Sequence, residues 1–146
     1  NLCANAIGQE IFGALAHESH HDLEKWYQTQ RDYYRELMLP LRESLLNLIP
    51  GLIVTSPEAA IYFIIDFKNI CNDSFNAKDF VQFCALKGKV KIEGKNYTLL
   101  LAPMAGFYSD PDKGKTQMRV AVVEPMYLIE KMPQLLSELY KSYLQL

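Results

Sequence analysis

Apolar residues recur at helical spacing along the first third of the chain. The positions that begin this pattern predict an amphipathic helix from about residue 4 to 17; they are Ile7, Ile11, Ala14 and Leu15. Ser19 followed by Asp22 matches a capping box and predicts the start of a second helix. The stripe of that helix repeats mostly every three or four residues: Leu23, Trp26, Tyr27, Tyr34, Leu37, Leu41, Leu45 and Leu48. Pro40 is expected to kink this helix or to end a first segment.

The middle of the chain changes to strand-like patterns after residues 49–51 (IPG), which should close the helical region. Residues 59–67 (AAIYFIIDF) are rich in β-branched and aromatic side chains and predict a strand. One face of this strand carries Ile61, Phe63, Ile65 and Phe67. A short helix should follow, capped by Asn76 and stopped by Gly88. Its apolar positions are Phe80, Phe83 and Cys84.

The last third of the chain predicts a hairpin, a strand and a final helix. The segments KVKIE and YTLLLA should form the hairpin about a turn at residues 94–96. SDPDKG has the composition of a turn, and residues 116–123 predict the strand that follows it. Pro125 should open the final helix and Pro133 should divide it. The stripe of this helix is Leu128, Ile129, Met132, Leu135, Leu136, Leu139, Tyr140 and Tyr143.

Few short strands among long helices indicate a two-layer α+β fold, with a small, mostly antiparallel sheet covered by helices on one side. The chain has 146 residues, of which 49% are apolar and 22% charged, so one folded globular unit is expected. The net charge is −2 and no basic block is present, which argues against nucleic acid or an anionic membrane as a partner. No apolar stretch approaches the roughly 20 residues of a membrane span, and no signal-peptide pattern opens the chain.

Histidine and cysteine offer little chemistry in this sequence. His17, His20 and His21 would share a face on a continuous helix and could then bind zinc. The helix boundary at Ser19 breaks that face, so solvated histidines are favoured and no metal site is expected. The cysteines are odd in number and form no C-x-x-C pair, which predicts reduced, cytosolic thiols. They are Cys3, Cys71 and Cys84.

Arg119 stands alone as a charge in an apolar strand pattern. Strand alternation points the core residues Met118, Val120 and Val122 away from it. Arg119 shares its own face with Ala121, whose small side chain leaves space beside the guanidinium. Such a planar fork suits bidentate capture of a carboxylate. An internal ion pair is the alternative, and the residue pattern alone favours it. The candidate partners are Asp66 and Glu124.

Several stretches resemble, in order, the C-terminal part of fold-type-I, pyridoxal-phosphate-dependent aminotransferases of the aspartate-aminotransferase-like class. Residues 9–15 match Q-x-x-x-x-A-L, and Arg31–Asp32 resembles the R-D pair of the interdomain helix. SPEAAIYFIIDF resembles P-x-G-A-x-Y with its following strand. APMAGFYSDPDKGKTQMRVAVVEP resembles the P-G-x-x-F-G loop and the R-[IV]-[AS] strand, and LIEKMPQLLSELYKSY the closing helix. Two departures are Ala59 in place of a glycine and Met104–Ala105 where proline–glycine is common.

The resemblance implies a role for Arg119, which occupies the arginine of R-[IV]-[AS] and would bind the substrate α-carboxylate. It implies residues 1–48 as connecting and interdomain helices and residues 49–146 as the small C-terminal domain. The pyridoxal phosphate lysine and its other binding groups would lie upstream, so this chain should contain no catalytic or cofactor-binding residue. The chain would then be an inactive fragment of a cytosolic homodimer that acts on an amino acid and a 2-oxo acid.

Two readings from other classes remain open. A stand-alone α+β module could bind a small carboxylate ligand or a partner protein through its sheet face. Alternatively, the first helix and a tyrosine-rich face could pair with a second copy of the chain. Those tyrosines, expected to pack in the core or in an interface, are Tyr27, Tyr33, Tyr34, Tyr140 and Tyr143.

Overall fold

The computed structural model describes residues 5–110 and 112–145. The chain forms two compact units, Asn1–Tyr34 and Arg35–Leu146. The first unit contains α1 (Ala6–Ala14), a 3₁₀ turn η1 (Leu15–His17) and the beginning of α2 (His20–Leu48). None of the helices in the described part of the chain has both the length and the apolar character that crossing a bilayer requires.

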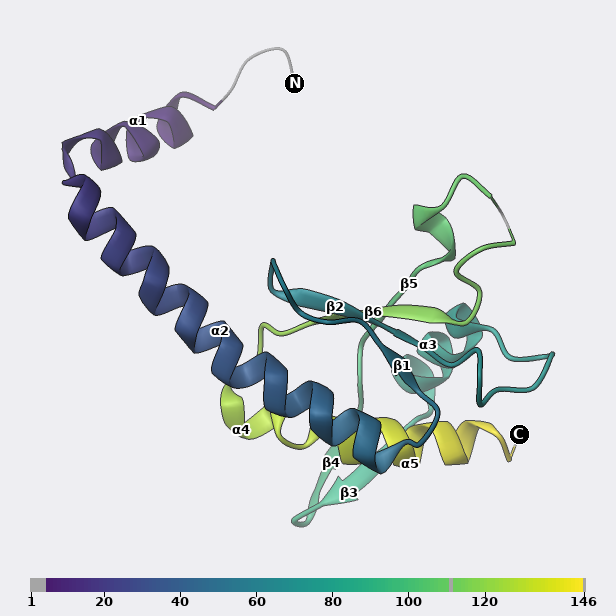
Figure 1. Ribbon diagram of the computed structural model, residues 1–146. Helices are drawn as coiled ribbons and strands as arrows, with labels where there is room; N and C mark the ends of the chain where they lie inside the picture. Colours follow the sequence, from purple (N-terminus) through teal and green to yellow (C-terminus); the bar gives the residue numbers. More distant parts are fainter. Residues whose placement is uncertain (1–4, 111, 146) are drawn as a thin grey trace. The chain divides into compact units, whose positions relative to one another are not determined.

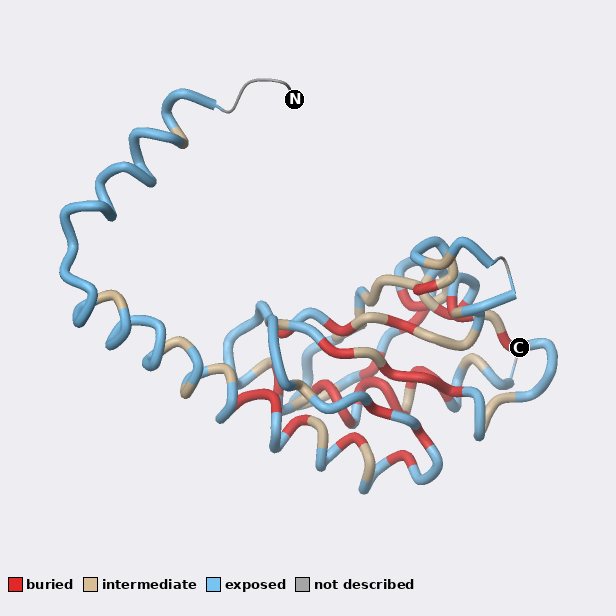
Figure 2. Tube along the Cα trace, turned by 45° about the horizontal axis from the view of Figure 1, so that its top comes forward, coloured by how far each residue is buried: buried red, intermediate tan, exposed pale blue. Residues whose placement is uncertain are grey.

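Side-chain caps begin both helices of the first unit. The Asn5 Oδ1 atom accepts a hydrogen bond from the Ile7 backbone N–H at 2.9 Å. At α2, the Ser19 Oγ atom accepts from the Asp22 backbone N–H at 3.1 Å and donates to the Asp22 carboxylate at 2.5 Å. The predicted helix start at Ser19 is therefore confirmed, and the Asp22 side chain bonds to the Ser19 hydroxyl. The apolar stripe of α1 is exposed in this chain, as the pale blue of this region shows (Figure 2).

α2 continues through Pro40 without interruption, so the prediction that this proline could end a helical segment is wrong. Proline removes one backbone donor and crowds the preceding turn. Here Pro40 lies on the exposed side of the helix. The core-facing residues on both sides of it are buried: Leu37, Met38, Leu41 and Leu45. Packing before and after the proline thus holds one helix together despite the lost hydrogen bond.

The second unit is built on a four-stranded antiparallel sheet in the order β1-β2-β6-β5. These strands are β1 (Ile53–Val54), β2 (Tyr62–Asp66), β6 (Gln117–Ala121) and β5 (Ala102–Pro103). β2 and β6 are the two central strands and form the longest ladder, in which Ile64 pairs with Arg119. The strands predicted at 59–67 and 116–123 are both present and lie side by side (Figure 1).

A separate two-stranded hairpin pairs β3 (Val90–Ile92) with β4 (Lys95–Tyr97). Its turn residues Glu93 and Gly94 both have positive φ, 51° and 82°, as a type I′ turn requires. The predicted second strand, residues 97–102, was wrong in extent. Pairing ends at Tyr97, and Ala102 belongs to β5 of the main sheet instead. The run of apolar residues indicated that this segment could adopt an extended backbone conformation. It did not indicate which strand the segment would pair with.

Four further helical segments complete the unit: α3 (Ala77–Leu86), the 3₁₀ turn η2 (Ala105–Phe107), α4 (Met126–Ile129) and α5 (Met132–Tyr143). The Asn76 Oδ1 atom caps α3 by accepting from the Lys78 backbone N–H at 2.9 Å, as predicted. The final helix is indeed divided, and Pro133 lies in the first turn of α5, where its missing donor costs nothing.

The core lies between one face of the main sheet and the helices of the second unit (Figures 1 and 2). The buried strand residues include Phe63, Ile65, Met118 and Val120, and Val122, just after β6, is buried as well. The buried helical residues include Leu45, Phe80, Leu136 and Leu139. This two-layer arrangement, with all ladders of the described strands antiparallel, confirms the predicted α+β class. The opposite face of the sheet, which carries Arg119, is only partly covered.

Candidate functional site

Arg119 lies in the middle of β6, a central strand of the main sheet. It is opposite Ile64 of β2 on one side and Ala102 of β5 on the other. Its chain neighbours Met118 and Val120 are 0% and 3% exposed, whereas Arg119 is partly exposed. The predicted alternation is confirmed, and it directs the guanidinium to the face of the sheet away from the core.

The guanidinium of Arg119 has no acidic partner among the described residues. Its Nε atom is buried without a hydrogen-bond partner. Asp66, the nearest candidate by sheet register, accepts three hydrogen bonds elsewhere, and Glu124 is exposed. The donors to Asp66 are the Lys68 backbone N–H at 2.9 Å, the Thr116 hydroxyl at 2.6 Å and the Gln117 side-chain amide at 2.9 Å. The internal ion pair that the residue pattern favoured is therefore not formed in the described part of the chain.

Two aromatic rings accompany Arg119 in place of an acid. The guanidinium carbon lies 5.0 Å from the ring centre of Tyr62 and 5.1 Å from that of Phe107. Both distances are within the range of cation–π attraction. The space expected beside Ala121 is thus occupied in part by Tyr62, which pairs with Ala121 across the β2–β6 ladder. A cation held by rings rather than by a carboxylate keeps its charge available to an external anion.

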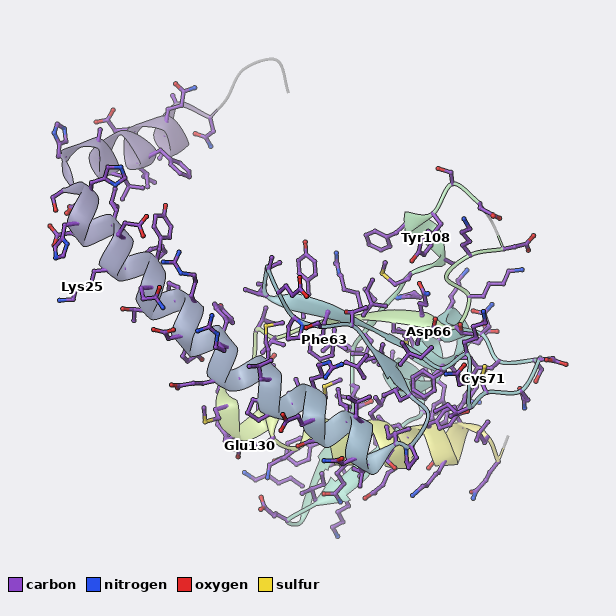
Figure 3. All side chains as sticks on the ribbon, viewed as in Figure 1. Lys25, Phe63, Asp66, Cys71, Tyr108 and Glu130 are labelled. Carbon is purple, nitrogen blue, oxygen red and sulfur yellow. The ribbon has the colours of Figure 1, made fainter. Side chains whose placement is uncertain are left out.

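A hydrogen-bonded chain fixes the sheet end next to Arg119. The Tyr108 hydroxyl donates to the Gln117 Oε1 atom at 2.7 Å, and the Gln117 amide donates to Asp66. Figure 3 shows Asp66, Cys71 and Tyr108 at this end, where they line an open hollow of about 640 Å³. Lysines and aspartates both line the hollow, and Lys115 pairs with Asp112 at 2.7 Å. The hollow therefore has no excess of either charge that would select an ion.

The ring of Tyr108 packs against a glycine that cannot be replaced without strain. Gly114 has φ +73°, and a Cβ atom built on it would lie 2.6 Å from the Tyr108 ring. Gly114→Ala is expected to lower the free energy of unfolding by about 1–3 kcal/mol. Thermal or urea unfolding followed by circular dichroism measures this change.

Gly106→Ala provides the matched control, because a Cβ atom there meets nothing within 4 Å and its φ is not in the left-handed region. This control should shift stability by no more than about 0.5 kcal/mol. Equal stability of the two variants would contradict the close packing of Gly114 on Tyr108.

The segment before β2 carries backbone strain at a place where the sequence departs from its resemblance. Ala60 has φ 64°, in the left-handed region that side chains with a Cβ atom adopt at a cost. One residue earlier, Ala59 occupies the position where the aminotransferase resemblance leads us to expect a glycine. The turn that leads into Tyr62 is thus formed without the residue best suited to it, and Ala60 bears the strain.

The remaining candidate residues lie apart from this face. His17, His20 and His21 are exposed at the junction of η1 and α2, and no group of three metal-ligating side chains occurs among the described residues. Cys71 and Cys84 are free thiols, and burial raises the pKa of Cys84 to about 11, which disfavours the thiolate. Cys3 lies outside the described residues.

Arg42 is a second arginine whose Nε atom is buried without a partner. It lies on α2 and not on the sheet face. Among the described residues, the cation–π contacts involve Arg119 alone. Arg119 is therefore the stronger candidate for an anion site. Arg42 is a suitable control residue for experiments on Arg119.

The sequence alone did not reveal the two aromatic contacts of Arg119. Tyr62 precedes it by 57 positions and Phe107 by 12, so no local spacing connects the three residues. The only available signal was indirect, since both aromatic residues lie in stretches that resemble aminotransferase sequences. The pairing of β2 and β5 with β6 brings them together.

No family model matches this chain, and no curated protein matches it either. Its fold is similar to three solved aminotransferases. One is YbdL from Escherichia coli, reported to have a methionine aminotransferase function, with TM-score 0.56 and 16% identity over 79% of this chain and 26% of that chain. Another is N-succinyldiaminopimelate aminotransferase from Mycobacterium tuberculosis, with TM-score 0.60 and 17% identity over 79% and 27%. The third is a probable N-succinyldiaminopimelate aminotransferase from Thermus thermophilus, with TM-score 0.52 and 22% identity over 73% and 23%.

These similarities establish the fold, and they confirm the predicted likeness to part of an aminotransferase. The chain spans about a quarter of the length of the solved structures it matches.

Proposed function

We propose that this chain is the small C-terminal domain of a pyridoxal-phosphate-dependent aminotransferase, with residues 1–48 serving as connecting and interdomain helices. The parent enzyme transfers an amino group between an amino acid and a 2-oxo acid. This chain contributes Arg119, which binds the substrate carboxylate, and it is inactive alone. The fold shared with three aminotransferases and the order of the matching stretches support this proposal.

The observation that carries the proposal is the unpaired guanidinium of Arg119 on a partly open sheet face. A permanently charged group with a buried nitrogen and no acid bound to it is costly unless a ligand completes it. A substrate carboxylate can do so with two parallel hydrogen bonds. Such a clamp would hold the amino acid by one end and fix the direction of its α-carbon bonds.

We propose that the attachment site for pyridoxal phosphate lies outside this chain. A lysine that attaches a cofactor needs a desolvated environment to be reactive. Of the lysines here, all of which are described, ten are exposed, and Lys131 pairs with Glu93 at 2.9 Å. We therefore assign cofactor attachment to the rest of the parent. When bound there, the cofactor delocalises the negative charge that develops on the substrate α-carbon.

The parent is proposed to be a cytoplasmic homodimer. Within the first unit, large apolar side chains are exposed, among them Ile7, Ile11, Phe12 and Trp26. Exposed apolar groups of this size are typical of surfaces that another protein segment covers. The remainder of the parent and its second subunit would provide that cover.

A stand-alone binding module is the alternative function. It would use the same sheet face to bind a small carboxylate or a partner protein without any chemistry. The two functions differ in what the full-length protein does, since only an aminotransferase turns over an amino acid.

The deciding experiment is an assay of the full-length parent with added pyridoxal phosphate. A panel of amino acids is supplied with 2-oxoglutarate, and glutamate is the measured product. Glutamate should form with at least one amino acid and only with the cofactor present. The 146-residue chain under the same conditions should form none. Absence of transfer by a cofactor-loaded parent would exclude the enzyme and favour the binding module, while activity of the isolated chain would refute its inactivity.

A further inference from the structure

The two rings next to Arg119 reach it from opposite sides of its strand. Tyr62 belongs to β2, and Phe107 lies in η2, which follows β5 after one residue. β2 and β5 are the two strands that flank β6. The guanidinium carbon is almost equally far from the two ring centres, at 5.0 and 5.1 Å. Arg119 is thus contacted by one aromatic residue from each neighbouring side.

The sheet register explains how the first ring can reach the guanidinium. Arg119 is directly opposite Ile64, and Tyr62 is opposite Ala121, so Tyr62 is the diagonal neighbour of Arg119 on the same face. Diagonal neighbours are about 7–8 Å apart at the backbone, within reach of long and aromatic side chains. Because Ala121 is small, it leaves the Tyr62 ring room to turn toward the arginine.

The second ring is held by the loop that carries it. The Phe107 backbone N–H donates to the Met104 carbonyl at 2.9 Å. The next residue, Tyr108, is tied to β6 through its hydrogen bond to Gln117. These contacts keep η2 close to the sheet. They hold Phe107 in position, although its own side chain is exposed and packs little.

Both residues are exposed, Tyr62 to 46% and Phe107 to 59%. They contribute little to the core, and the contacts with Arg119 are the only ring interactions recorded for them among the described residues. Attraction to the ring faces restrains the long arginine side chain. It forms no hydrogen bond with any N–H donor of the guanidinium, so the donors other than the buried Nε–H stay available for a ligand. A carboxylate partner such as Asp66 would have consumed those donors.

We infer that Tyr62 and Phe107 are positioning residues, an aromatic clamp that holds the guanidinium of Arg119 in place for a carboxylate ligand. The inference rests on the proposed role of Arg119 as the carboxylate-binding group. Preorganisation of this kind lowers the entropy lost on binding. It also explains how Arg119 can keep a fixed orientation without an ion pair in the described chain.

Nuclear magnetic resonance of the ¹⁵N-labelled chain tests the clamp with two readouts. The first is the Arg119 Nε–Hε resonance, assigned by its loss in Arg119→Ala, whose proton shift reports the ring currents of the two aromatic residues. The second is the dissociation constant for sodium acetate, with sodium chloride at equal ionic strength as the reference. The variants are Phe107→Leu and Tyr62→Leu, and Tyr62→Phe keeps the ring as the matched control.

Each leucine variant should shift the Arg119 Hε resonance and weaken acetate binding about two- to fivefold. Tyr62→Phe should resemble the wild type in both readouts. Circular dichroism confirms that each variant is folded, and a variant that fails to fold is replaced by the methionine substitution at the same position.

The outcomes separate the clamp from the function on which it rests. Acetate affinity that is unchanged in Arg119→Ala, or absent in the wild type, contradicts the carboxylate role of Arg119, whatever the rings do. Affinity that is lost in Arg119→Ala but unchanged in both leucine variants, with an unmoved Hε resonance, overturns the clamp and leaves the arginine role intact.

Discussion

Arg119→Ala in the full-length parent is expected to lower kcat/KM for the amino-acid substrate by about two to three orders of magnitude. Truncating one partner of a hydrogen-bonded charge pair that is shielded from water costs about 2–5 kcal/mol, because the other charge is left unpaired. Each 1.4 kcal/mol corresponds to about a tenfold change in rate. No acidic residue pairs with Arg119 among the described residues. The interaction lost in the alanine variant should therefore be the one with the substrate carboxylate.

Steady-state kinetics, with the absorbance of bound pyridoxal phosphate measured in parallel, check this expectation. The cofactor should be retained, since we assign its attachment to other parts of the parent. Arg119→Lys keeps the charge but loses the planar fork, and should fall between the wild type and the alanine variant. Arg42→Ala is the control, because Arg42 also has a buried, unpaired Nε but lies on α2. Unchanged kinetics in Arg119→Ala would remove this residue from the substrate site.

Phe67→Ala is expected to lower the free energy of unfolding of the chain by about 3–5 kcal/mol. Phe67 is 0% exposed and follows β2 directly. Its ring centre lies 4.6 Å from that of Tyr140, 5.3 Å from Phe75 and 6.0 Å from Phe80. Removing the ring opens a cavity at the centre of this cluster, where strand, α3 and α5 meet. Domains of this size are typically stable by only about 5–15 kcal/mol, so the variant should be close to unfolding.

Urea unfolding followed by circular dichroism measures the effect. Phe12→Ala removes the same ring from a position on α1 that is 75% exposed, and it should change stability by no more than about 0.5 kcal/mol. Similar losses in the two variants would show that the cluster around Phe67 is not the packed centre of the second unit.

Local patterns predicted most of the elements of this chain, because they depend on neighbours in the sequence. The alternation of Met118, Val120 and Val122 identified the core face of β6 and of the residue that follows it. Asn76 marked the start of α3, and its side chain does cap that helix. In each case a few adjacent residues are enough to make the prediction. The physical cause is the alternation of side chains along a strand in the first case and an unpaired backbone N–H at a helix start in the second.

The errors occurred where distant packing decides between local options. Pro40 was expected to kink the helix or to end a first segment, and the second alternative is wrong, because α2 continues with buried core residues on both sides of the proline. Residues 97–102 were assigned to one strand, but only Tyr97 pairs in the hairpin and only Ala102 pairs in the main sheet, and the residues between them belong to neither. Neither choice can be read from propensity, since the competing conformations differ mainly in their long-range contacts.

For the candidate site, the sequence by itself determined that β6 would direct one arginine away from the core, because side chains alternate along a strand. Only the tertiary structure decided what surrounds that arginine. Asp66 is occupied by three other donors, and Tyr62 and Phe107 lie against the guanidinium. The register of β2 and β5 against β6 sets these contacts. Register is a property of paired strands that no single stretch of sequence contains.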